Sequence, residues 1–138
     1  MVSIEKISRK SIQLDEYFDI LGKISETPRH VFVKDKILVG SAKYYLQVAI
    51  ETCLDVANHI IAAERFRAPK DYADAFTVLE ENNILGKMIG QKLRQMAKFR
   101  NRLVHLYGEI DDAFVYEFII NDIKDIQFFR KMIIQKYV

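Results

Sequence analysis

The sequence is poor in residues that bend or cross-link a chain: among 138 residues it has two prolines, five glycines, one cysteine and no tryptophan. A single cysteine excludes an intrachain disulfide. The scarcity of turn formers, with 50% hydrophobic and 29% charged residues, is typical of an ordered helical protein and excludes a disordered or fibrous one. Cys53 lies in the apolar-rich segment 48–61, so we expect it to be a reduced core residue.

Several function classes lack their sequence signatures. No apolar run approaches the roughly 20 residues of a membrane span, and residues 1–6 lack the apolar core of a signal peptide. There is no P-loop, GxGxxG, nucleophile-elbow or paired-carboxylate motif, and no Cys, His or Asp spacing matches a metal site. We therefore expect a cytoplasmic protein without membrane contact, metal or cofactor, in which His30 and His59 are ordinary residues.

Acidic residues are missing from one long stretch of the chain. No Asp or Glu occurs between Asn82 and Gly108, whereas six basic residues do: Lys87, Lys92, Arg94, Lys98, Arg100 and Arg102. A solvated helix face normally mixes its signs. Because the net charge of the chain is only +2, any attraction for nucleic acid must come from this local cluster.

The hydrophobic periodicity predicts an all-α protein, a single domain over residues 1–138 built as an up-and-down bundle of about five helices. A stripe in strict heptad steps indicates close packing against a neighbour: Ala42, Leu46, Ala49, Cys53, Val56, Ile60 and Ala63. Segment 31–39 has an extended alternative because of its β-branched residues. The first expected helix runs from Ser3 to a break at 22–28, and the second covers 28–67 with a bend at 40–41. The third covers 71–81. The fourth covers 84–107 with Gly108 as its stop, and the fifth runs from 111–112 to the end.

The fourth expected helix carries the candidate site. At 100° per residue, a polar stripe on one side falls within about 60°, and it contains Arg94, Lys98, Asn101 and His105. The opposite side contains Met96, Phe99, Leu103 and Leu106, which we expect to face the core. Arg100 lies at the margin of the apolar side with Tyr107 almost directly above it, and a cation there needs a partner or an interface.

Arg100 and His105 point about 140° apart on a regular helix, so one straight helix cannot aim both at the same atom. Either the helix is distorted before Gly108, or two copies of the chain share the site. A two-fold axis beside this helix would bring both copies of the motif to one cleft. We therefore predict a homodimer that dimerises beside the fourth helix and forms a composite site.

The series Arg100-Asn101-x-x-x-His105-x-Tyr107 resembles the signature of the HEPN superfamily, and specifically of HepT-like toxins encoded beside a minimal nucleotidyltransferase antitoxin of the MntA type. The resemblance extends over most of the chain. It includes the helix at 46–60, the segment 69–79 with Tyr72 and Phe76, and Ile110-Asp111 after the motif.

This resemblance implies a metal-independent endoribonuclease toxin that acts as a dimer on RNA, with tRNA among the candidate substrates. His105 would move protons and Arg100 would stabilise charge on phosphorus while the ribose 2′-OH attacks. Asn101 would position the phosphate or orient His105, and Arg94, Lys98 and Arg102 would contact the RNA backbone. Tyr107 would accept AMP from the nucleotidyltransferase partner, which would silence the toxin.

Other interpretations stay open. By its sequence position alone, Tyr107 is better explained as an aromatic at the edge of the core, and the family pattern reverses that preference. Glu51, Asp55 and Asn58 either support the cleft or form a solvated face. The whole protein could instead be a non-catalytic subunit that binds nucleotide or substrate for a separately encoded nucleotidyltransferase. A helical scaffold without a nucleic-acid role would leave the acid-free basic stretch unexplained.

Overall fold

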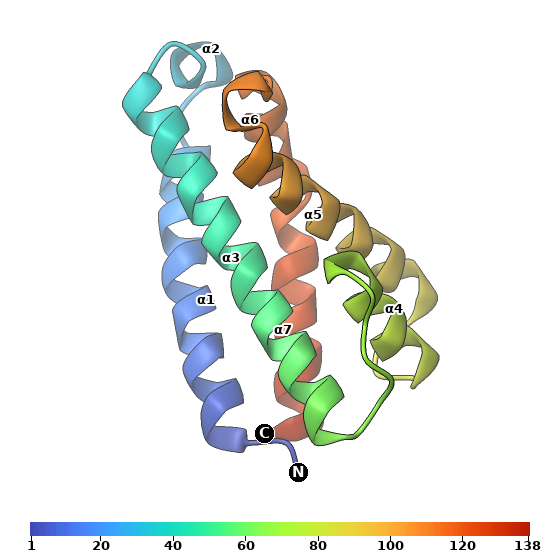
Figure 1. Cartoon of the computed structure of the whole chain (residues 1–138). Coiled ribbons are helices and arrows are strands. Elements are labelled where there is room, and N and C mark those ends of the chain that lie inside the picture. The colour runs from blue at the N-terminus through green and yellow to red at the C-terminus, as the bar shows by residue number, and fades with distance from the viewer.

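The computed structural model describes the backbone of residues 1–138 and all side chains except that of Tyr107. Helices make up the described chain, and no strand occurs in it (Figure 1). In order the elements are α1 (Ile4–Ser25), α2 (Arg29–Phe32), α3 (Lys36–Ala63), α4 (Tyr72–Glu81), α5 (Lys87–His105), the 3-10 turn η1 (Tyr107–Glu109), α6 (Asp112–Asn121) and α7 (Ile123–Tyr137). The all-α prediction is confirmed.

Side-chain caps begin several of these helices. The Ser3 hydroxyl accepts a hydrogen bond from the Lys6 backbone N–H at the start of α1. Asp35, Asp71 and Asp111 cap α3, α4 and α6 in the same way. A capping oxygen satisfies backbone N–H groups that have no partner inside the helix. The sequence prediction was correct for the starts at Ser3 and Asp111.

The helix expected over 28–67 is in fact two helices. The chain turns between Phe32 and Lys36, where the Asp35 carboxylate accepts from Ile37 and Leu38 and begins α3. α3 then continues through the expected bend at 40–41 and ends at Ala63. Arg65 there adopts a left-handed φ of 58°, and the Phe66 N–H bonds back to Ile61, which is a Schellman ending without glycine.

Two further boundaries differ from the prediction. The last helix is divided at Asp122 into α6 and α7. The basic helix spans 87–105 rather than 84–107, and Gly108 does not stop it with a left-handed backbone, since no glycine has a positive φ. Asn82 and Asn83 do end α4, because Asn83 takes φ 60° and the Ile84 N–H bonds to Leu79.

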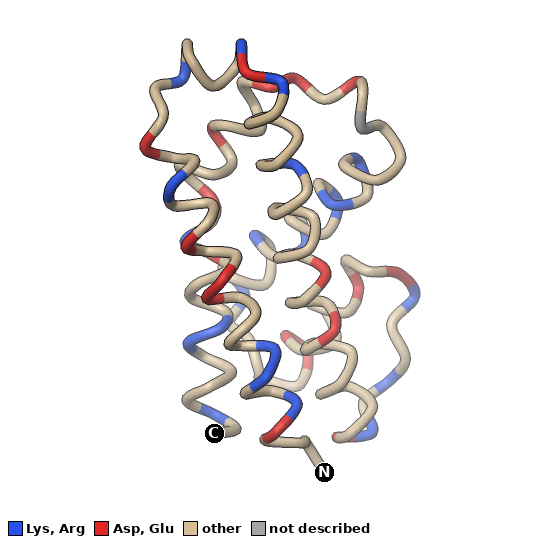
Figure 2. The backbone as a smooth tube through the Cα atoms, turned by 90° about the vertical axis from the view of Figure 1, so that its left-hand side faces the viewer, with Lys and Arg blue, Asp and Glu red and all other residues tan. Residues whose placement is uncertain are grey.

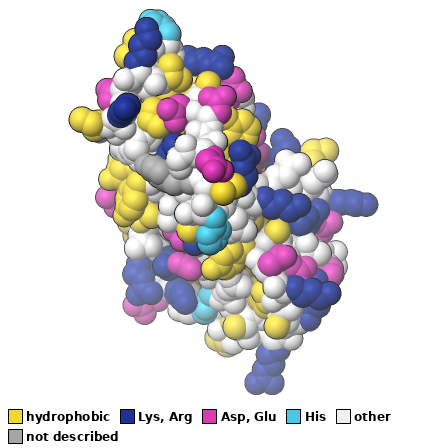
Figure 3. Space-filling model, turned by 45° about the horizontal axis from the view of Figure 1, so that its top comes forward, with side chains coloured by type: hydrophobic (Ala, Val, Ile, Leu, Met, Phe, Trp, Pro, Cys, Tyr) yellow, Lys and Arg dark blue, Asp and Glu magenta, His cyan; other side chains and the backbone are white. Residues whose placement is uncertain are grey.

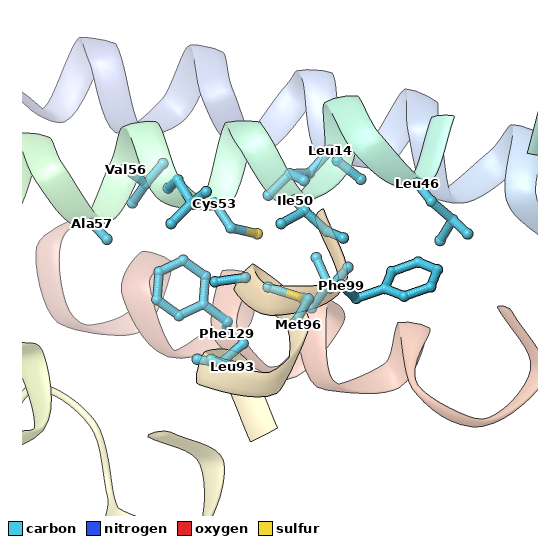
Figure 4. Packing of buried hydrophobic residues seen from close by; sticks show 14 of the residues in the cluster. Leu14, Leu46, Ile50, Cys53, Val56, Ala57, Leu93, Met96, Phe99 and Phe129 are labelled. Atoms are coloured by element: carbon cyan, nitrogen blue, oxygen red, sulfur yellow. The ribbon is translucent and has the colours of Figure 1, made fainter. Parts of the chain in front are cut away.

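The core lies where α1, α3, α5 and α7 meet (Figure 4). Six of the seven residues of the α3 heptad stripe are buried, and Ala63 is half-buried. Alanines in this stripe let α1 approach α3 closely. Cys53 is fully buried among these side chains (Figure 4), and burial raises the pKa of its thiol well above the ordinary value. It is therefore the unreactive core residue that the sequence indicated.

The elements that build the candidate site flank this core. α4 packs along α5, and the loop 64–71 carries the chain from the end of α3 to α4. The two chain ends lie close together at the end of the bundle opposite α2 and α6 (Figure 1). Among the helices described here, none combines the length and apolar character that a membrane crossing requires.

Candidate active site

α5 presents the basic motif on one exposed face and an apolar face to the core. Lys and Arg recur along this helix without an intervening acid (Figure 2). Met96, Phe99 and Leu103 are buried as predicted. Leu106 is 45% exposed, so its predicted place in the core is wrong, because α5 ends at His105 and the chain leaves the helix there.

Arg100 is held in a partly buried polar setting. Its side chain is only 13% exposed, and its Nη2 lies 2.8 Å from Oε2 of Glu51 on α3. Nη1 donates to the Asn101 side chain at 3.3 Å. The guanidinium carbon lies 4.9 Å from the centre of the Tyr72 ring, a cation–π distance. The cation at the apolar margin therefore has the partner that its position requires.

Of the acids on α3, Glu51 reaches the motif and Asp55 does not. Glu51 also accepts a hydrogen bond from Gln47 one turn earlier, so its carboxylate is fixed from two sides. Asp55 is 56% exposed and pairs with Lys10 of α1. The sequence left both acids open, because a helix wheel places them on α3 but does not tell which neighbour they meet.

A cleft of about 450 Å³ opens beside His105. It is lined by Asn58, Pro69, Lys70, Asp71, Tyr72, Asn101 and His105. His105 is exposed. Asn101 and Tyr72 line this cleft and also contact Arg100, so these two side chains connect the arginine with the histidine. The sequence resemblance included Tyr72 and the segment 69–79, but it assigned no place in the cleft to Tyr72 or to the wall at 69–71.

The loop wall of the cleft is fixed by Arg67. Its guanidinium donates to both Asp74 oxygens at 2.8 and 3.0 Å and to Glu81 at 2.9 and 3.0 Å. The Lys70 N–H donates to Asp74 as well. The Arg67 hydrogen bonds hold the pKa of Asp74 well below its usual range. This network ties the loop 64–71 to α4 and so sets where Pro69 and Lys70 stand.

The three side chains predicted to contact the RNA backbone have different surroundings. Arg94 pairs with Glu80 of α4, and Gly90 gives this pair its space, since a Cβ there would lie 2.5 Å from the Glu80 carboxylate. Arg94 is therefore not a free cation of the cleft. Lys98 and Arg102 are exposed and line a second groove on the other flank of α5. Figure 3 shows that basic, acidic and hydrophobic side chains are intermixed on the surface towards the α2 and α6 end.

Within one chain, Arg100 and His105 do not line the same cavity. Arg100 faces Glu51 and Tyr72, whereas His105 lines the open cleft. The helix remains regular up to His105, so a distortion of α5 does not bring the two together. The predicted AMP acceptor, the Tyr107 side chain, lies outside the described residues.

The chemistry available at the cleft is that of an exposed imidazole beside an amide and a paired guanidinium. An imidazole gains and loses protons near neutral pH, and a guanidinium stabilises phosphate oxygens. Among the described side chains, no group of three or more His, Cys, Asp or Glu residues is arranged to hold a metal ion. The arrangement suits proton transfer at a phosphodiester.

The chain is similar to ribonuclease families in sequence. The sequence profile of the family described as Ribonuclease HepT-like matches residues 14–133. The mRNA nuclease HepT of Shewanella oneidensis is 31% identical over 102 residues, which cover 74% of this chain and 77% of that protein.

Solved structures have the same fold. The tri-AMPylated HEPN toxin of Shewanella oneidensis, in complex with an MNT antitoxin, superposes with a TM-score of 0.88 at 26% identity and covers 95% of this chain and 98% of its own. A toxin–antitoxin structure with AMP-PNP gives a TM-score of 0.87 at 26% identity, over 94% of this chain and 97% of that one.

Proposed function

This chain belongs to the HepT-like ribonuclease family, and from that premise we propose that it is a metal-independent endoribonuclease toxin acting as a homodimer of one HEPN-like domain per chain. The observation that carries the proposal is the exposed His105 in a cleft whose Asn101 and Tyr72 also contact the ion-paired Arg100. Related chains are a nuclease and an AMPylated toxin bound to its antitoxin.

In the proposed reaction RNA supplies its own nucleophile. The ribose 2′-oxygen forms a bond to phosphorus as its proton passes to an imidazole, and the bond from phosphorus to the 5′-oxygen breaks as that oxygen receives a proton. His105 performs the proton transfers and Arg100 stabilises the negative charge on the phosphoryl oxygens. The products are a 2′,3′-cyclic phosphate and a 5′-hydroxyl end, so no metal-bound water is needed.

A second copy of the chain completes the proposed site. Val104 and Leu106 are 39% and 45% exposed beside His105, and apolar side chains at a motif of this kind favour burial against a partner. A two-fold axis there places the His105 of one protomer near the Arg100 of the other. Asn101 holds the phosphate or orients His105, and Lys98 and Arg102 guide the RNA backbone.

Silencing of the toxin is proposed to occur at Tyr107, by transfer of AMP from an MntA-type nucleotidyltransferase partner. The related Shewanella toxin is tri-AMPylated in complex with an MNT antitoxin. Bulk and negative charge beside His105 would exclude the RNA phosphates.

The test is RNA cleavage in EDTA by purified, unmodified protein. We expect wild type to cut single-stranded RNA or tRNA and His105→Ala to lose at least about 100-fold in rate. His30→Ala is the matched control, because His30 is also exposed but lies on α2, away from the cleft. RNA left intact by wild type and by His105→Ala alike would reject catalysis and favour the alternative, a subunit that only binds nucleotide or substrate for the nucleotidyltransferase. Equal cleavage by the two proteins would remove His105 from the proposed catalytic role.

The same preparations test the silencing step. After incubation with ATP and the nucleotidyltransferase, mass spectrometry should find AMP on wild type and none on Tyr107→Phe. Modified wild type should no longer cut RNA. Modification at another residue, with cleavage unchanged, would contradict the assignment of Tyr107.

A further inference from the structure

The second groove along α5 is lined by aromatic and basic side chains that the proposed chemistry does not use. It measures about 320 Å³ and is lined by Lys92, Gln95, Met96, Lys98, Phe99, Arg102, Phe114, Phe118, Asp122 and Asp125. This volume is at the lower end of the range for small-ligand sites. It fits one planar group rather than a protein segment.

The floor of the groove is a set of packed phenylalanine rings. Phe99 and Phe118 are stacked, with ring centres 4.4 Å apart and an interplanar angle of 10°. Both are almost fully buried, whereas Phe114, 5.5 Å from Phe99, is 42% exposed. The exposed ring of Phe114 is a surface on which another planar group can stack.

Cations border the exposed ring. The Arg102 guanidinium lies 5.7 Å from the centre of the Phe114 ring, and Lys98 stands one turn earlier on the same side of α5. Neither pairs with a carboxylate among the described residues, whereas Lys92 lies 3.8 Å from Asp125. Unpaired cations beside an exposed aromatic ring are the combination that binds single-stranded nucleic acid, by backbone contact and base stacking.

The groove lies next to the cleft, on the flank of α5 that faces away from Val104. On a regular helix Arg102 points about 60° from His105 and about 160° from Val104. The rise from Arg102 to His105 is only about 4.5 Å. A strand whose phosphate reaches His105 can therefore continue over Arg102.

We propose that this groove is a base-stacking subsite for single-stranded RNA, which holds a nucleotide neighbouring the scissile phosphate. Phe114 supplies the stacking face, and Lys98 and Arg102 bind the adjoining phosphates. The inference rests on the proposed ribonuclease function and adds a substrate-binding site to it. Because a base must leave its helix to enter the groove, the site selects unpaired RNA over duplex.

Asp122 gives the subsite a base preference. Its half-buried carboxylate lines the groove and accepts no hydrogen bond among the described residues. A carboxylate is an acceptor that pairs with the N–H groups of adenine, cytosine and guanine. Uracil presents fewer such donors, so uracil is the least favoured occupant.

The test measures RNA binding in the non-cleaving His105→Ala background. Fluorescence anisotropy would compare a labelled single-stranded RNA with the same RNA carrying one abasic nucleotide at successive positions. Phe114→Ala should weaken binding of the intact RNA about fivefold to 100-fold. At one position, removing the base should weaken RNA binding to the protein that retains Phe114. The same change should leave RNA binding to Phe114→Ala unaltered. Phe114→Trp should restore the difference.

The matched control is Phe128→Ala, since Phe128 on α7 is 49% exposed and lines another groove. It should leave RNA binding unchanged. Asp122→Ala should remove the discrimination against uracil at the position found above. Cleavage by Phe114→Ala with His105 intact should persist with a raised KM, which separates failure of the subsite from failure of the ribonuclease function.

Two results would overturn the subsite. In one, no abasic position shows coupling to Phe114 while the wild type still cuts RNA. In the other, Phe114→Ala leaves RNA affinity intact but dissociates the dimer or abolishes binding of the nucleotidyltransferase in size-exclusion chromatography. The second result would assign the groove to a protein interface.

Discussion

Arg100 has its charge balanced by Glu51 before any substrate arrives. The 2.8 Å ion pair is 13% exposed on the arginine side and 33% on the glutamate side. Such a pair contributes little net stability, but loss of one partner leaves the other charge poorly solvated. Gln47 donates to the Glu51 carboxylate, and Asn101 and Tyr72 contact the Arg100 guanidinium. The arrangement fixes the direction of the guanidinium, while the Glu51 carboxylate offsets part of its positive charge.

The first prediction concerns this residue pair. Glu51→Ala should lower kcat of RNA cleavage about tenfold to 100-fold with little change in KM, because the guanidinium loses its fixed direction. Glu51→Gln keeps a carbonyl oxygen for Nη2 and should recover part of the rate. Asp55→Ala, one turn along α3 and paired with Lys10, should behave as wild type. Equal rates for Glu51→Ala and wild type would show that Glu51 does not position Arg100.

At the scale of the element, the site depends on how neighbouring helices are held against α3. Two hydrogen bonds hold the start of α1 there. The Met1 ammonium donates to the Ala63 carbonyl at 3.4 Å. The Ser3 backbone N–H donates to Nε2 of His59 at 2.9 Å. Only a neutral imidazole accepts this bond. Burial, helped by Lys6 and the chain N-terminus, lowers the pKa of His59.

This contact predicts a pH dependence of stability. The unfolded chain binds a proton at His59 at higher pH than the folded chain, so the free energy of unfolding falls as the pH drops below about 6.5. His59→Gln can accept the same bond without titrating. Between pH 7.5 and 5, denaturant unfolding should show wild type losing about 0.5 to 1 kcal/mol more than the variant, the worth of one hydrogen bond. Parallel pH profiles for the two proteins would contradict this account.

For the molecule as a whole, the separation of Arg100 from His105 within one chain is the reason for proposing a site shared by two chains. The two side chains lie in different surroundings on a helix that stays regular between them. One chain therefore offers half of the proposed chemistry at each place. In the proposed homodimer, a symmetric pair of chains would supply both halves at one cleft.

Mixed dimers test this assembly. Arg100→Gln and His105→Ala should each be inactive alone, and Gln at position 100 keeps an amide donor for Glu51. Dimers co-expressed with one variant on each chain, and purified through two tags, should regain ribonuclease activity that neither parent has. The control is a dimer in which both chains carry His105→Ala, purified through the same two tags. If the mixed dimers stay inactive although native mass spectrometry shows both chains, each site is built within one chain.

Local pattern in the sequence was sufficient for much of the structure. The α3 heptad stripe, the caps at Ser3 and Asp111 and the apolar face of α5 were all predicted, because periodicity and capping depend on residues within a turn or two. The breaks at 33–35 and at Asp122 were missed. Arg65 ends α3 with a left-handed backbone that usually signals glycine, so its residue type gave no warning.

Residue spacing was enough to predict that a basic helix carries Arg100, Asn101 and His105, since spacing along a helix fixes which side chains share a face. The neighbours of these side chains could be read only from the packing of the folded chain. Glu51 meets Arg100 across 49 positions of chain, and Arg94 is paired with Glu80. The Phe114 groove exists because α6 folds against α5. Such contacts depend on the packing of separate helices, which periodicity within one helix does not encode.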